Sequence, residues 1–223
     1  MNETRAVDGR RARTRSADVE RELLAAAEAV LAREGPGGLT VRAVAAEAGI
    51  APMGVYNHLG GKDGLIEALL TRGFHQLRAA VEPGDEPDKL DRLRNSQLRY
   101  RGFALANPHL YAMMFENTVP HQRSSPAFSE HAAAAFTTLV RNVELAAATG
   151  AITAPEPRAA AQQIWSAVHG AVTLELKGLL QVPDPEAAFR ELVSTLLRGL
   201  AQTPTGQTTK TPRSPIPMGC ARG

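Results

Sequence analysis

The 223-residue sequence predicts an all-α fold, in which a small N-terminal three-helix unit precedes a larger helical domain. In nearly every periodic segment, apolar residues recur every three or four positions, as on a helix with one buried face. Glycines and prolines separate these segments where helices are expected to end or begin. We find no useful length of the apolar–polar alternation that marks a half-buried strand.

The N-terminal unit starts with a predicted helix that ends at Gly35. The apolar stripe of this helix is Leu23, Leu24, Ala27, Val30 and Leu31. Thr40 suits the N-cap of a second helix that runs to about residue 48, because its hydroxyl can accept a bond from a free backbone N–H. Pro52 fits the first turn of a short third helix, where the N–H that proline lacks is not needed.

A longer fourth helix is followed by a break, PGDEP at residues 83–87, which predicts a domain boundary. The apolar stripe of the fourth helix is Ile66, Leu69, Leu70, Phe74 and Leu77. Further helices are predicted at 90–106, 108–116, 128–149, 157–180 and 185–200, with a polar loop at 120–126. We therefore expect a flexible basic arm (1–16), a helix-turn-helix domain (17–80), a helical domain (88–201) and a disordered tail (202–223).

Composition favours a folded cytoplasmic protein without metal or cofactor. The chain is 43% hydrophobic with a net charge of +2, so it is not a polycation that coats nucleic acid. Its only cysteine, Cys220, excludes an internal disulfide. No apolar run follows the N-terminal arginines, so we expect no signal peptide, and no apolar stretch reaches the length of a membrane span.

Arginines crowd the first fifteen residues of the chain. They are Arg5, Arg10, Arg11, Arg13 and Arg15. Such an arm suits phosphate or minor-groove contact beside a DNA-binding motif. The alternative is a solvated, disordered terminus.

Residues 40–62, TVRAVAAEAGIAPMGVYNHLGGK, have the pattern of a helix-turn-helix. Ala45 and Ala48 are small where the two helices cross, and Gly49 tolerates a positive φ at the turn. The apolar residues that pin the second helix against the first are Val44, Ile50 and Val55. The opposite side of the second helix is then free to enter a DNA groove.

Residues 19–74 resemble the DNA-binding domain of TetR/AcrR-type transcriptional regulators. The resemblance lies in AREG at the end of the first helix, in LTVRAVAAEAGI and in VYNHLGGKDGLIEALL. The pattern Tyr-x-His-(aromatic or Leu)-x-x-Lys-acid-x-Leu is formed by Tyr56, His58, Leu59, Lys62, Asp63 and Leu65. The resemblance implies a sequence-specific DNA-binding regulator.

The resemblance also implies a set of DNA-binding residues. They are Thr40, Arg42, Ala51, Pro52, Met53, Gly54, Tyr56, Asn57, His58 and Lys62. Residues 51–54 open the recognition helix and face the major groove, while Thr40 resembles a phosphate-binding residue, as do Tyr56, His58 and Lys62. The last three have structural alternatives, which are packing for Tyr56, capping or packing for His58, and simple solvation for Lys62.

The recognition helix departs from the usual pattern of this family in two places. Ala51 stands where Ser or Thr is common, so the side-chain cap is lost. Gly54 costs about 1 kcal/mol relative to alanine in a helix, and either permits close approach to DNA or is merely tolerated. Base recognition then relies on contact with thymine methyl groups, with Asn57 or Arg42 as polar readers.

The second domain has a weaker resemblance to TetR-type C-terminal domains that carry a Trp-x-x-x-His-Gly motif. It lies in RGFALANPHLYAMMF at 101–115 and WSAVHG at 165–170, and implies a domain that dimerises and binds a small effector. The candidate effector-binding residues are Tyr100, Phe103, Tyr111, Met114, Phe115, Trp165 and His169. The alternative for each is ordinary core packing, and His169 could also be a satisfied core histidine or a metal ligand.

The last two predicted helices are apolar on more than one face, which favours a four-helix interface between two chains. A homodimer also matches a palindromic operator in double-stranded DNA. The favoured function is a homodimeric transcriptional regulator, a repressor released by a small apolar effector. One alternative is a regulator without an effector, controlled by concentration or a protein partner. A helical enzyme or carrier is the other, although no nucleophile–base pair, phosphate loop or metal motif supports it.

Overall fold

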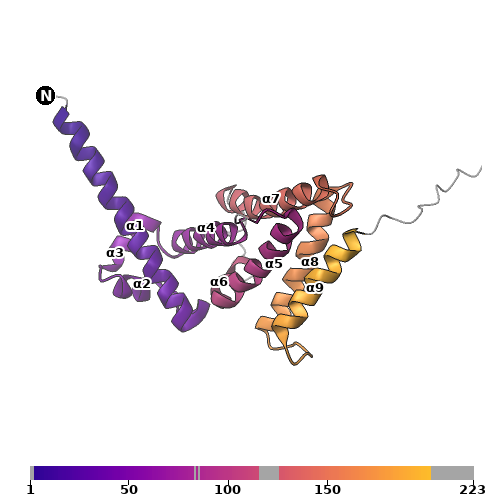
Figure 1. Ribbon diagram of the computed structural model, residues 1–223. Coiled ribbons are helices and arrows are strands. Elements are labelled where there is room, and N and C mark those ends of the chain that lie inside the picture. Colours follow the sequence, from indigo (N-terminus) through magenta and orange to yellow (C-terminus); the bar gives the residue numbers. More distant parts are fainter. Residues whose placement is uncertain (1–2, 83, 85, 116–125, 202–223) are drawn as a thin grey trace, which may run out of the picture.

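The computed structural model describes the backbone of residues 3–82, 84, 86–115 and 126–201, and every regular element within these ranges is a helix. Figure 1 shows α1, α2 and α3 gathered at one end of the molecule and α8 and α9 at the other. The predicted tail at 202–223, which contains Cys220, and most of the predicted loop at 120–126 lie outside the described residues. No helix in the described part is long and apolar enough to cross a membrane.

The first helix, α1 (Glu3–Gly38), starts earlier than expected. We expected a flexible arm at residues 1–16, but the backbone is helical from Glu3. This segment has no proline and is rich in Arg, which favours helix. The side chains of the arginines among the first fifteen residues lie outside the described part of the structure. The predicted end is confirmed, since Gly35 leaves helical geometry with φ of 69°.

The helix-turn-helix is formed by α2 (Val41–Glu47) and α3 (Pro52–Leu59), as predicted. Thr40 caps α2, because its hydroxyl oxygen accepts a 3.1 Å hydrogen bond from the N–H of Ala43. Gly49 makes the turn with φ of 68°. The small and apolar residues that were expected to pin the helices together are buried at Val44, Ala45 and Val55. Local sequence therefore determines this motif closely.

The fourth helix, α4 (Lys62–Val81), belongs to both halves of the fold. It packs against α1 and α3 in the N-terminal half and against α5, α6 and α7 in the C-terminal half. Its buried residues form one continuous hydrophobic core with those of the other helices. The predicted break at residues 83–87 lies between the end of α4 and the start of the next helix.

The C-terminal helices are α5 (Lys89–Ala106), α6 (Pro108–Phe115), α7 (Pro126–Ala148), α8 (Pro157–Leu176) and α9 (Pro185–Ala201). α8 is four residues shorter than the predicted 157–180, because the chain turns at Gly178 with φ of 65°. A nearly buried ion pair joins α5 to α8, in which the Arg101 guanidinium donates two hydrogen bonds, of 2.8 and 2.6 Å, to the Glu175 carboxylate. The Arg101 guanidinium also lies 5.8 Å from the centre of the Phe189 ring on α9. These contacts hold three helices of the C-terminal half together.

Candidate DNA-binding surface and ligand cavity

The recognition helix α3 has one buried and one exposed side. Val55 is fully buried, whereas the first residues of the helix are open to solvent, with Met53 64% exposed. No side chain caps α3 at Ala51, as the sequence predicted. Helix α3 therefore presents an apolar, solvent-exposed N-terminal end.

Two glycines position the side chains around this surface. A Cβ on Gly54 would lie 2.5 Å from Cδ1 of Ile50, so the missing side chain makes room for Ile50 where α3 packs. A Cβ on Gly61 would lie 2.9 Å from Cε1 of Tyr56, so the Tyr56 ring packs directly over that glycine. The same ring remains 55% exposed. Tyr56 is therefore held in place by packing and still reaches solvent.

The expected phosphate contacts lie on α2, α3 and the start of α4, which pack against one another in pairs α2·α3 and α3·α4. Thr40, Arg42, Asn57 and Lys62 are exposed. His58 is half-buried, and its Nδ1 lies 3.3 Å from the hydroxyl of Ser16 on α1. This bond ties α3 to α1 and supports the packing alternative for His58 in the free protein. All ten expected residues are exposed except Gly54 and His58.

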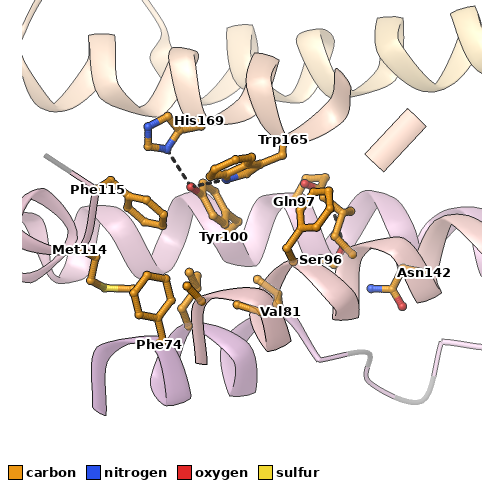
Figure 2. A pocket seen from close by; sticks show the side chains of 15 residues that line it. Phe74, Val81, Ser96, Gln97, Tyr100, Met114, Phe115, Asn142, Trp165 and His169 are labelled. Atoms are coloured by element: carbon orange, nitrogen blue, oxygen red, sulfur yellow. Dashed lines mark hydrogen bonds between the residues drawn. The ribbon is translucent and has the colours of Figure 1, made fainter. Parts of the chain in front are cut away.

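A cavity of about 320 Å³ lies between α4, α5, α6, α7 and α8 (Figure 2). Its lining residues are Phe74, Leu77 and Val81 of α4, Ser96, Gln97 and Tyr100 of α5, Met114 and Phe115 of α6, Ala132, Ala135, Phe136, Leu139 and Asn142 of α7, and Trp165 and His169 of α8. A mostly apolar cavity of this size, with a few polar groups, is typical of a small-molecule site.

Five of the seven residues proposed from sequence for effector binding line this cavity, and two do not. Phe103 lies one turn of α5 beyond Tyr100, past the last residue that α5 contributes to the lining, and is buried in the core instead. Tyr111 lies behind the lining and contacts it through its hydroxyl. None of the lining residues that α4 and α7 contribute was predicted from the sequence. Asn142 was the available signal there, because it interrupts the apolar face of α7 that carries Leu139 and Val143.

One end of the cavity is closed by a hydrogen-bonded network. The Trp165 indole N–H donates to the Tyr100 hydroxyl at 3.3 Å, and the Tyr100 and Tyr111 hydroxyls are 2.9 Å apart. Nδ1 of His169 lies 2.6 Å from the Tyr111 hydroxyl and 3.0 Å from that of Tyr100, within hydrogen-bonding distance of both. Figure 2 shows His169 and Trp165 of this network meeting at the Tyr100 hydroxyl.

Burial keeps this network uncharged. It lowers the pKa of His169, which favours the neutral ring, and raises the pKa of Tyr100 to about 12. The pKa of Tyr111 is also raised by burial. His169 is thus a satisfied histidine, and among the described residues no three His, Cys, Asp or Glu side chains gather to hold a metal ion.

The other end of the cavity contains three buried, uncharged polar residues. Ser96 and Asn142 are 1% exposed and Gln97 is 4% exposed. Ser96 donates to the Leu93 carbonyl at 2.8 Å, and the Gln97 amide donates to the Ser96 hydroxyl at 2.8 Å. The Nδ2 of Asn142, in contrast, is buried without a hydrogen-bond partner.

A helix-turn-helix with an exposed recognition helix, joined to a helical domain that contains a cavity, is the architecture of helix-turn-helix regulators. Comparison with known families agrees. Residues 23–69 match the tetR family of bacterial regulatory proteins, and residues 93–196 match the tetracyclin repressor-like C-terminal domain. The chain belongs to the TetR family, a family of DNA-binding transcriptional regulators and not of enzymes.

Individual relatives cover most of the chain. An uncharacterised HTH-type transcriptional regulator, Rv0681, of Mycobacterium tuberculosis is 27% identical over 86% of this chain and 86% of its own length. A solved protein of unknown function from Rhodococcus sp. RHA1 is 31% identical, with a TM-score of 0.73 over 82% of this chain and 96% of its own. A solved tetR-family protein from Rhodococcus RHA1, at 22% identity and a TM-score of 0.60, shares the fold over 82% of this chain and 96% of its own.

Proposed function

We propose that this regulator is a homodimeric repressor that binds a palindromic operator and is released by a small, mainly apolar effector in the cavity. The observation that carries the proposal is the course of α4. This helix begins with Lys62 beside the recognition helix and lines the cavity with Phe74, Leu77 and Val81. An occupant of the cavity therefore touches the same rigid element that positions a DNA-contacting residue.

The ten residues on α2, α3 and the start of α4 are the proposed DNA contacts. Exposure of Tyr56 and Lys62 supports their role as phosphate ligands, because each side chain can reach the DNA backbone without unpacking. The Thr40 hydroxyl accepts the bond that caps α2, and its proton can still be donated to a phosphate. The exposed Met53 supports apolar contact with thymine methyl groups in the major groove.

The outer face of α8 and α9 is the proposed dimer interface, in a revised form. Most of the apolar residues expected there, such as Ile164, Val168 and Val193, are buried inside the protomer. The large apolar side chains left exposed near the end of α8 are Leu174, Leu179 and Val182. A second copy of the chain would cover these residues. We also propose that the C-terminal domain belongs to the Trp-x-x-x-His-Gly subclass and that the regulator is cytoplasmic. Light scattering of the purified protein measures its mass and tests the dimer.

The function is tested by selecting bound duplexes from a random DNA pool with the purified protein and measuring their affinities by fluorescence anisotropy at stated salt. We expect a palindrome to be enriched, bound by the native dimer and lost in the Tyr56→Ala variant. A folded dimer that enriches no sequence would contradict operator binding by the free protein.

Control by a protein partner or by concentration is the second candidate function. The cavity supports a small-molecule effector instead, because its mainly apolar lining surrounds a volume that such a molecule can fill. The two are separated by whether any cavity-binding molecule changes operator affinity.

A further inference from the structure

The polar groups of the cavity restrict what its occupant can be. None of the described residues that line it is Asp, Glu, Lys or Arg. A carboxylate or an ammonium buried here would lose its hydration and gain no opposite charge, which is costly. The lining therefore favours an uncharged molecule.

Asn142 adds a directional requirement. Its side chain is 99% buried, and its Nδ2 has no hydrogen-bond partner. Figure 2 shows this nitrogen turned toward the other lining side chains. A buried donor without a partner costs free energy. A ligand whose acceptor bonds to this nitrogen removes that cost, and so gains more binding free energy than one that only exchanges a hydrogen bond with water.

The position of Asn142 in the lining also indicates the shape of a molecule that would fit the cavity. The lining residues of α7 run from Ala132 to Asn142, which is about 15 Å along a helix. The wall between them is apolar, with Leu139, Phe136 and, opposite, Phe74 and Leu77. An elongated apolar body with a polar group at one end fits this arrangement.

We propose that the effector is an uncharged, elongated apolar molecule whose carbonyl oxygen accepts a hydrogen bond from Asn142. The proposal rests on the effector-controlled function given above and narrows it to a ligand class. It excludes molecules that enter as carboxylates, although their apolar bodies are the same.

A matched pair of nine-carbon probes tests the ligand class, namely methyl heptyl ketone and nonanoate. Trp165 is the only tryptophan of the chain and lines the cavity, so its fluorescence reports binding without DNA. At neutral pH we expect the ketone to bind the full-length protein at least about tenfold more tightly than the ionised acid.

Two variants test the role of Asn142. Asn142→Leu removes the donor while keeping the branched shape of the side chain, and should weaken ketone binding about threefold to tenfold. This variant should fold, since it removes an unpaired buried polar group. Glu144→Leu, a change to the same residue at an exposed position of α7 outside the lining, should leave ketone affinity within about twofold and serves as the control.

The outcomes separate the two proposals. Ketone binding that is no tighter than nonanoate binding, that is unchanged in Asn142→Leu, or that is undetectable up to the solubility limit overturns the ligand class. A ketone that binds through Asn142 and leaves operator affinity unchanged supports the ligand class and contradicts effector control.

Discussion

Gly64, in the first turn of α4, gives the sharpest test of how the DNA-binding domain is held together. A Cβ at this position would lie 1.7 Å from the carbonyl oxygen of Leu59, the last residue of α3, whereas real contacts of this kind stay beyond 3.0 Å. The Gly64→Ala change therefore forces the two helices apart by more than about 1 Å, and backbone shifts of this kind cost about 3 kcal/mol. The higher helix propensity of alanine offsets up to about 1 kcal/mol of this loss of stability. The expected net loss is about 2 kcal/mol.

Thermal unfolding measures this loss against two matched glycines. For a chain of this size, 2 kcal/mol lowers the midpoint by about 4–8 °C. Gly102→Ala, in the interior of α5 with nothing within 4 Å of the added Cβ, should instead raise it by about 2–4 °C. Gly54→Ala should lie between them, because only the flexible end of Ile50 must move. A Gly64→Ala protein that unfolds at or above the native midpoint would refute the reasoning.

Three further results are expected. Tyr56→Ala and Lys62→Ala should each weaken operator binding for all sequences. Lys62→Ala also removes a positive charge, so it should reduce the salt slope of log K by about 0.9, and an unchanged slope by anisotropy counts against its phosphate contact. Arg101→Met leaves the Glu175 carboxylate nearly buried and unpaired, so urea unfolding should show a loss of about 3 kcal/mol, and a loss under about 1 kcal/mol would contradict this. Burial lowers the folded-state pKa of His169, so the unfolded chain binds more protons and stability falls as pH drops below about 6.5. Denaturation at several pH values should show a shallower acid decline in His169→Gln, and equal declines would exclude this contribution.

Local chemistry made the N-terminal half predictable. Thr40 and Gly49 determine a cap and a turn through their own side chains or lack of one, so no distant contact is needed to place them. The sequence placed a basic arm at 1–16 ahead of the first helix, whereas the backbone of α1 is already helical from Glu3, where arginines favour helix.

The cavity was only partly predictable, because it depends on which helix faces meet. Trp165 and His169 lie four residues apart on one helix, so their spacing alone places them on the same face. Asn142 and Phe74 come from helices far apart in sequence, and no local pattern brings α4 and α7 together. The same holds for the dimer face, where apolar residues of α8 proved to be needed for the core of one chain.

The length of α4 turns small movements into larger ones. Its 20 residues form one continuous helix without a proline, and Lys62 stands about 22 Å along the axis from Leu77 at the cavity wall. A tilt of about 5° at the cavity end thus displaces the lysine by about 2 Å at this helical rise. The phosphates of a duplex have fixed positions. A small tilt of α4 at the cavity wall therefore moves Lys62 away from the phosphate that it would contact.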